Sequence, residues 1–115
     1  MRILIVDDNS NMREMTRFFL DDLGAVFREC EDGVEALEAY RSFRPDWVLM
    51  DWEMARMDGI TATRRIVRAF PQARIVLFTQ YDDAQLKAAA GEAGALGYVL
   101  KDELINLRRI LTASR

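Results

Sequence analysis

Histidine is absent from the 115 residues, and there are only one cysteine and two prolines. Without histidine, the chain cannot carry a Ser-His-Asp or Cys-His catalytic site, an imidazole-dependent zinc site or a phosphohistidine. The single thiol, Cys30, cannot form a disulfide within the chain. Every uninterrupted apolar run is far shorter than the roughly 20 residues that cross a bilayer. The chemistry of the chain must therefore rest on carboxylates, hydroxyls and lysine.

The charge balance is mildly acidic, with 19 acidic against 16 basic residues and a net charge of −3. Sequence-independent nucleic-acid binding needs a basic face, so the balance disfavours it. The length favours a single domain over residues 1–115. We expect a cytoplasmic protein with no direct contact to membrane or nucleic acid.

Five short apolar runs predict strands: Ile3–Val6, Ala25–Phe27, Trp47–Met50, Ile75–Phe78 and Tyr98–Leu100. Most are continuous rather than alternating, which is typical of strands covered on both faces of a parallel sheet. Strand starts near residues 2, 25, 46, 74 and 97 leave room for a helix after each strand. The pattern predicts five consecutive strand–helix units in an α/β fold.

The segments between the runs carry helix signals. The expected N-terminal capping residues are Ser10, Asp32, Asp58, Asp82 and Asp102. The expected buried stripe of the first helix is Met12, Met15, Phe19 and Leu23. Pro45 and Pro71 keep the second and third helices from running into the next strands.

Polar side chains follow four of the strands. Asp7 and Asp8 come after the first, Asp51 after the third, Thr79 ends the fourth, and Lys101 follows the fifth. The carboxyl ends of parallel strands share one edge of the sheet, where ligands bind. We therefore expect these side chains to converge in one crevice.

Three carboxylates and one ammonium leave that crevice with a net charge of −2. A divalent cation would neutralise it, and an all-oxygen donor set favours Mg²⁺. The Asp-Asp-Asn-Ser loop lacks the glycines that wrap a phosphate. Asp51, at the centre of the array, is the best candidate for a nucleophile that forms an aspartyl phosphate, with Lys101 and Thr79 beside its oxygens.

These segments resemble the receiver (CheY-like) domain of bacterial two-component response regulators over essentially the whole chain. The matching stretches are Ile3–Asn9, Val48–Asp51, Met57–Gly59, Phe78–Thr79 and Ala93–Asp102. The resemblance implies a flavodoxin-like, doubly wound sheet with strand order 2-1-3-4-5. It also implies that the chain is a phosphoacceptor signalling domain whose only reactions are its own phosphorylation and dephosphorylation.

The resemblance further implies roles for individual residues. Asp51 would accept a phosphoryl group from a sensor histidine kinase or a phosphotransfer protein. Asp8, Asp51 and the backbone carbonyl of Glu53 would hold Mg²⁺, with Asp7 acting largely through a metal-bound water. Lys101 would pair with the phosphoryl oxygens. Thr79 and Tyr98 would form the switch that changes the surface of the fourth helix, fifth strand and fifth helix, where an effector protein or output domain binds.

Departures and alternatives remain at this stage. Ala55 stands where the family often has proline, and Asp102 follows Lys101 where many members have a proline. Tyr98 is also compatible with ordinary core packing. A small Mg²⁺-dependent phosphohydrolase and a receiver-like scaffold that works without phosphorylation are the alternative functions. The sequence leaves open a homodimer through the fourth and fifth helices.

Overall fold

The computed structural model of the protein describes residues 1–113 and shows five parallel strands in the order β2-β1-β3-β4-β5. The strands are β1 (Arg2–Val6), β2 (Val26–Cys30), β3 (Trp47–Met50), β4 (Ile75–Thr79) and β5 (Gly97–Leu100). Each begins within one residue of its predicted start. The expected flavodoxin-like α/β fold and strand order are confirmed.

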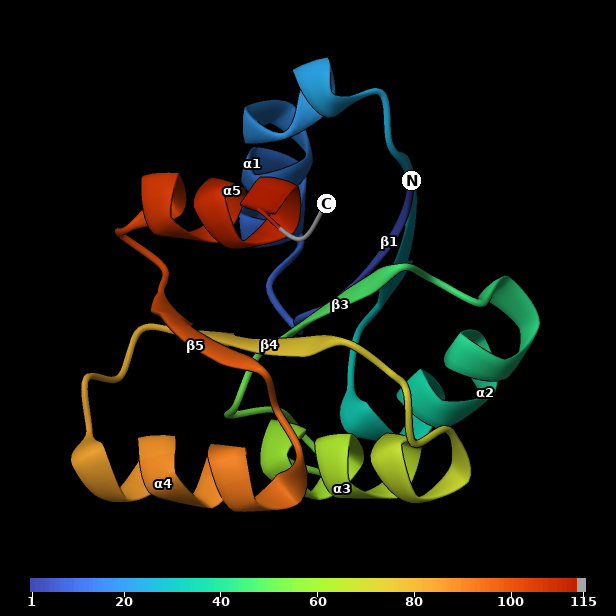
Figure 1. The fold of residues 1–115 in the computed structure, drawn as a ribbon, viewed down its shortest axis with the longest axis vertical. Helices are drawn as coiled ribbons and strands as arrows, with labels where there is room; N and C mark the ends of the chain where they lie inside the picture. Colours follow the sequence, from blue (N-terminus) through green and yellow to red (C-terminus); the bar gives the residue numbers. More distant parts are fainter. Residues whose placement is uncertain (114–115) are drawn as a thin grey trace.

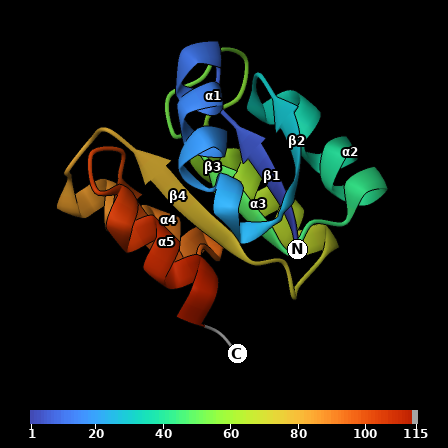
Figure 2. The same ribbon diagram turned by 90° about the horizontal axis from the view of Figure 1, so that it is seen from above.

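Helices cover both faces of the sheet. They are α1 (Ser10–Phe19), a 3₁₀ turn at Asp21–Leu23, α2 (Gly33–Phe43), α3 (Gly59–Ala69), α4 (Ala84–Ala93) and α5 (Leu104–Ala113). Helices α1 and α5 lie on one face, and α2, α3 and α4 lie on the other (Figure 1). The view from above shows α1 and α5 in front of the strands and the other three helices beside or behind them (Figure 2). No helix within residues 1–113 combines the length and the apolar composition needed to span a membrane.

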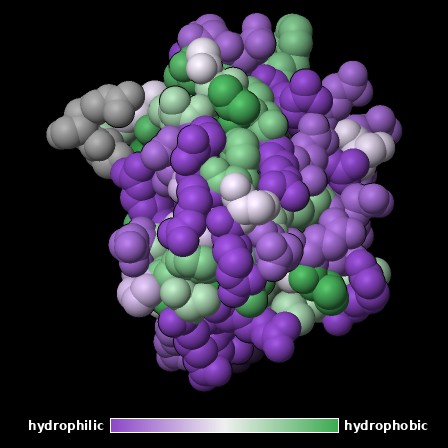
Figure 3. All heavy atoms as spheres, turned by 90° about the vertical axis from the view of Figure 1, so that its right-hand side faces the viewer, coloured by the Kyte–Doolittle hydropathy of each residue, from purple (hydrophilic) through white to green (hydrophobic). Residues whose placement is uncertain are grey.

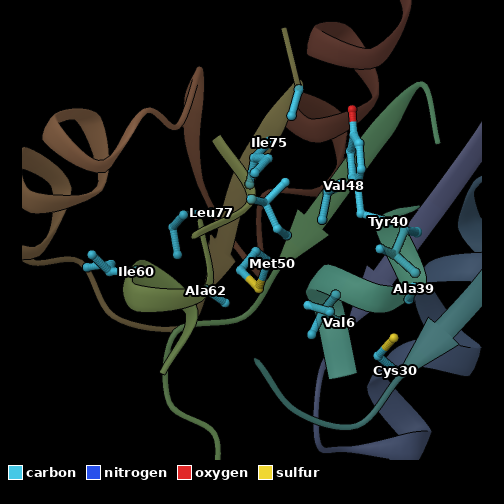
Figure 4. Packing of buried hydrophobic residues seen from close by; sticks show 14 of the residues in the cluster. Val6, Cys30, Ala39, Tyr40, Val48, Met50, Ile60, Ala62, Ile75 and Leu77 are labelled. Carbon is cyan, nitrogen blue, oxygen red and sulfur yellow. The ribbon is translucent and has the colours of Figure 1, made fainter. Parts of the chain in front are cut away.

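The two helical layers create two buried clusters, one on each side of the sheet. Along β1, Leu4 and Val6 point into the cluster beneath α2, α3 and α4, whereas Ile3 and Ile5 point toward α1 and α5. Figure 4 shows the first cluster, in which Met50 and Leu77 from neighbouring strands lie between the sheet and α3. Because both faces are buried, the strands need continuous rather than alternating apolar residues.

Side-chain caps begin four of the helices. Asp32 and Asp58 act as predicted, each accepting hydrogen bonds from two backbone N–H groups at the start of α2 and α3. Two predicted caps are wrong by one residue, because Asn9 caps α1 in place of Ser10 and Asp83 caps α4 in place of Asp82. Neighbouring residues of similar capping strength make this choice invisible in the sequence.

The prediction for α5 is also wrong at its start. The helix begins at Leu104, and Asp102 lies in the turn before it. The N–H of Glu103 donates to the carbonyl of Leu100, and the carbonyl of Glu103 accepts from Leu107, so backbone bonds close this helix start. The chain is already turning tightly at residues 101–103, which places Asp102 too early to cap.

One residue of the expected stripe on α1 is not buried. Met15 is 54% exposed and Phe18 is 83% exposed. Met12 and Phe19, in contrast, pack against the buried cluster between the sheet and helices α1 and α5. Thr16 takes the inward position instead and is 1% exposed, with its hydroxyl donating to the carbonyl of Met12.

The face of the molecule that turns α2 toward the viewer is mostly hydrophilic, with hydrophobic atoms in small separate patches (Figure 3).

Helix α5 offers a matched test of the core. Leu107 is fully buried and Ile105 is 59% exposed on the same helix. We predict that Leu107→Ala lowers the free energy of unfolding by about 2–5 kcal/mol because it leaves a cavity against the sheet. Ile105→Ala should change it by less than about 0.5 kcal/mol. Urea denaturation followed by circular dichroism measures both, and equal losses would contradict the assigned packing.

Candidate functional site

The predicted polar residues do meet at the carboxyl edge of the sheet. Val6 and Met50 are partners in the β1–β3 pairing, so Asp7 and Asp51, which follow them, leave the sheet side by side. The Asp51 N–H donates to the carbonyl of Val6 at 2.9 Å. On the other side, the Lys101 N–H donates to the carbonyl of Thr79 at 2.8 Å. Together with the pairing of β3 and β4, these contacts bring four strand ends together.

The ammonium of Lys101 lies between two of the carboxylates. Its Nζ is 2.8 Å from Oδ2 of Asp7 and 3.2 Å from Oδ1 of Asp51. Asp7 and Asp51 are 3% and 8% exposed, so these charges are largely removed from water. Asp7 Oδ1 also accepts the N–H of Asn9, and Asp51 Oδ1 accepts the N–H of Trp52.

Burial is the largest influence on the pKa of Asp51. Burial raises the pKa of Asp51 to about 6, the negative charge of Asp7 adds to the rise, and Lys101 opposes it. Burial alone would lower the pKa of Lys101, but its hydrogen bond with Asp7 and the charge of Asp51 outweigh burial and raise it. The lysine therefore stays charged, yet it does not fully relieve the repulsion between the two aspartates.

Asp8 completes an acidic group. One carboxylate oxygen from each of Asp7, Asp8 and Asp51 lies within 4.8 Å of the others. Asp8 is exposed, and no hydrogen bond or ion pair holds its side chain among residues 1–113. Hard carboxylate donors with an open side suit Mg²⁺, which keeps several waters, so these residues fit the ion.

A depression of about 270 Å³ opens above the carboxylates. It is lined by Asp8, Asn9, Asp51, Glu53, Gln80, Tyr81 and Lys101. The Tyr81 hydroxyl donates to Oε1 of Glu53 at 2.5 Å, and the Tyr81 ring meets the Trp52 ring edge-on, with centroids 5.1 Å apart. Glu53 thus lies at the rim of the pocket, as expected for a residue two positions after Asp51.

The two expected switch residues, Thr79 and Tyr98, both bond to the backbone of Tyr81. Thr79 is fully buried, and its Oγ1 accepts the N–H of Tyr81 at 3.2 Å. The hydroxyl of Tyr98, which is half-buried, donates to the carbonyl of Tyr81 at 2.5 Å. Residue 81 therefore links the end of β4 to the ring on β5.

Arg13 holds the loop of the first two aspartates, and sequence reasoning missed it. Its Nη1 donates to the carbonyl of Asp7 at 2.6 Å, and its Nε pairs with Glu29 on β2 at 2.7 Å. The only feature of the sequence that could have indicated this role is the position of Arg13 in the first turn of a helix that follows an acidic loop. No pattern in the sequence indicated its partner Glu29, which lies 16 positions further along the chain.

Gly59 allows the chain to pass close to Asp51. A β-carbon at Gly59 would lie 1.7 Å from the carbonyl oxygen of Asp51, and its N–H donates to the carbonyl of Trp52 at 2.8 Å. Any side chain there would displace the backbone of Asp51. This contact explains why the Met57-Asp58-Gly59 stretch requires glycine.

Comparisons with known proteins agree with this geometry. The family model described as the response regulator receiver domain matches residues 3–114. The chain is 41% identical over 101 residues to the chemotaxis protein CheY of Bacillus subtilis, covering 87% of this chain and 84% of that protein. It is 39% identical over 117 residues to the uncharacterized transcriptional regulatory protein YhcZ of Bacillus subtilis, covering 96% of this chain. The chain spans only 54% of the length of YhcZ.

Solved structures show the same fold. A two-component response regulator of the LuxR family from Aurantimonas sp. SI85-9A1 superposes with a TM-score of 0.89 at 36% identity, covering 99% of this chain and 86% of that one. The doubly wound sheet with an acidic pocket and lysine at its carboxyl edge defines a receiver-type phosphoacceptor domain. The chain belongs to the response regulator receiver family of two-component systems.

The raised pKa of Asp51 makes a prediction about stability. Between its unfolded value near 3.8 and about 6, the folded state binds more protons than the unfolded state, so stability falls as pH rises through this window. Above the window the ionised carboxylate destabilises the fold. In metal-free buffer at pH 7.5, Asp51→Asn should therefore raise the free energy of unfolding by up to about 3 kcal/mol.

Urea denaturation at pH 7.5 and at pH 4 measures this gain, which should shrink at the lower pH. Glu92→Gln, at an exposed carboxylate on α4, serves as the control and should change stability little at either pH. A gain for Asp51→Asn that is equal at both pH values would argue against a desolvated, repelled carboxylate.

Proposed function

We propose that Asp51 accepts a phosphoryl group in a Mg²⁺-dependent reaction, so that the chain works as a phosphorylation-controlled switch. The observation that carries this proposal is the arrangement of Lys101 between Asp7 and Asp51, with Asp8 open beside them. It combines a desolvated carboxylate, a fixed cation and an acidic group suited to a metal.

The two oxygens of Asp51 differ in their surroundings. Oδ1 accepts the Trp52 N–H and faces Lys101, whereas the described residues do not hold Oδ2. We assign the attack to Oδ2: a bond forms from Oδ2 to phosphorus as the bond from phosphorus to the donor's leaving atom breaks. Lys101 then neutralises a phosphoryl oxygen, and Thr79 donates its hydroxyl to another.

Asp7, Asp8, Asp51 and the backbone carbonyl of Glu53 are the groups that would hold Mg²⁺, with Asp7 acting largely through water. The bound ion would offset the charge of the carboxylates and of the incoming phosphoryl group. The role of Glu53 rests on the family resemblance and on its place at the rim of the pocket.

We propose that Thr79 and Tyr98 transmit the change. When Thr79 turns its hydroxyl to a phosphoryl oxygen, its bond with the Tyr81 N–H weakens, and the backbone of Tyr81, whose carbonyl accepts from Tyr98, is free to move. The Tyr98 ring then shifts between two positions, which alters the surface of α4, β5 and α5. Because both side chains bond to the backbone of Tyr81, a switch role is favoured over ordinary core packing for Tyr98.

The phosphodonor in this proposal is a sensor histidine kinase or a phosphotransfer protein in the cytoplasm, and the target is an effector protein or an output domain. YhcZ is named a transcriptional regulatory protein, and the chain matches 54% of its length. That similarity supports an output that acts on transcription. Residues 1–115 would form the receiver domain of such a protein, and a homodimer through α4 and α5 is compatible with it.

Phosphorylation is directly testable. Incubation with Mg²⁺ and acetyl phosphate should add one phosphoryl group to wild type, visible as a mass increase, and none to Asp51→Asn. Glu92→Gln, at an exposed residue that does not line the pocket, should label like wild type. Labelling of Asp51→Asn at the wild-type rate would defeat the assignment. Multiple-turnover hydrolysis of phosphomonoesters would favour the phosphohydrolase alternative, and no labelling of wild type would favour the scaffold.

Metal binding makes a separate prediction. Asp8→Asn removes a negative ligand from the open side of the pocket, so the Kd for Mg²⁺ measured by isothermal titration calorimetry should rise by about tenfold or more. Glu92→Gln again serves as the control. An unchanged affinity in Asp8→Asn would mean that the ion binds elsewhere.

A further inference from the structure

The loop between β3 and α3 contains a tight turn at Arg56. The N–H of Met57 donates to the carbonyl of Ala55 at 2.8 Å, and Arg56 at the centre has a φ of 69°. A bond across three residues with a positive φ at the middle one marks a strained γ-turn. Side chains with a β-carbon disfavour this conformation, so contacts outside the turn must hold it.

The side chain of Arg56 supplies such contacts. Its Nε donates to Oδ2 of Asp32 at 2.9 Å, and its Nη2 contacts the same oxygen. The Nη2 atom also lies 3.8 Å from Oε2 of Glu35. The other oxygen of Asp32 caps α2 by accepting two backbone N–H groups. Asp32 therefore ties the turn to the first residues of α2, and the guanidinium lowers the pKa of its carboxyl.

A second contact joins the same two segments. A β-carbon at Gly33, the first residue of α2, would lie 2.7 Å from the carbonyl oxygen of Met57. The backbone after Arg56 thus approaches α2 more closely than any side chain at Gly33 would permit. The loop that begins at Asp51 and includes Glu53 is therefore fastened at its far end to α2, outside the acidic pocket.

We propose that Arg56 is a positioning residue for the metal pocket: its ion pair with Asp32 and Glu35 holds the loop after Asp51 in the shape that binds Mg²⁺. The inference rests on the proposed metal-dependent phosphorylation. Groups that hold ligands in place raise metal affinity because less order is lost on binding. Once metal saturates the pocket, the loop is held by the ion, and the rate of phosphorylation no longer depends on Arg56.

The competing reading is a surface ion pair without function. The Arg56 side chain is 59% exposed, and exposed pairs usually contribute little. Arg41 and Glu38 on α2 form such a pair, at 2.8 Å and with the arginine 50% exposed. Arg41→Ala therefore removes an arginine of similar exposure that has no link to the loop, and it is the matched control.

Two variants separate the ion pair from the backbone. Arg56→Gly deletes the guanidinium and still accepts a positive φ, and Asp32→Asn keeps an oxygen that can cap α2 while losing the charge. We expect each to raise the Kd for Mg²⁺ by about 3- to 10-fold in calorimetric titration. The double variant should bind Mg²⁺ no more weakly than either single variant, because each substitution removes the same contact between Arg56 and Asp32. Acetyl phosphate labelling at saturating Mg²⁺ should stay within about twofold of wild type.

Arg56→Lys keeps the charge but not the two-atom contact, so its Kd should fall between wild type and Arg56→Gly. If Arg56→Gly does not fold, Arg56→Lys and Asp32→Asn decide the question. A Mg²⁺ affinity equal to that of Arg41→Ala in these variants would overturn the role of Arg56 while Asp51 still labels, leaving the proposed function intact. Loss of labelling at saturating Mg²⁺ in Arg56→Gly would also overturn it. Failure of wild type to label would instead reject the proposed function.

Discussion

The pocket depends on one interaction, the Lys101 ammonium held between the carboxylates of Asp7 and Asp51. Two buried anions at adjacent strand ends would otherwise repel each other at close range in a medium that screens poorly. The lysine relieves part of that repulsion, but burial and the remaining charge of Asp7 still raise the pKa of Asp51 to about 6. The remaining repulsion between the carboxylates favours the binding of a further cation. The parallel sheet brings Asp7, Asp51 and Lys101 together.

Arginines outside the pocket fasten both acid-bearing loops. Arg13 ties the carbonyl of Asp7 to β2 through Glu29, and Arg56 ties the end of the β3–α3 loop to Asp32. Arg13 reaches β2 and Arg56 reaches the start of α2, and neither β2 nor α2 contributes a charged group to the pocket. The site is therefore supported by β2 and α2, although its charged groups come from β1, β3 and β5.

Apolar runs and strand ends were sufficient to predict the strands and the convergence of Asp7, Asp51 and Lys101, because the carboxyl ends of parallel strands share one edge of the sheet. The strand order came from the resemblance to receiver domains. Sequence reasoning failed where neighbours compete, as at Ser10 and the cap of α4, and at the start of α5, where a backbone turn stands in place of a side-chain cap. It also missed Arg13 and Arg56, because their partners lie far away in the chain and a guanidinium carries no periodic signal. Contacts of that kind depend on how loops fold back, which no local pattern encodes.

The two indoles of the chain lie at opposite ends of β3. Trp47 begins the strand and is 4% exposed beneath the Arg74 guanidinium, whereas Trp52 follows Asp51 and meets Tyr81 edge-on. Only the second shares a peptide bond with Asp51. Replacing Trp47 by phenylalanine would leave Trp52, next to Asp51, as the only tryptophan of the chain, so that tryptophan emission would follow ion binding and phosphoryl turnover in real time without an attached dye.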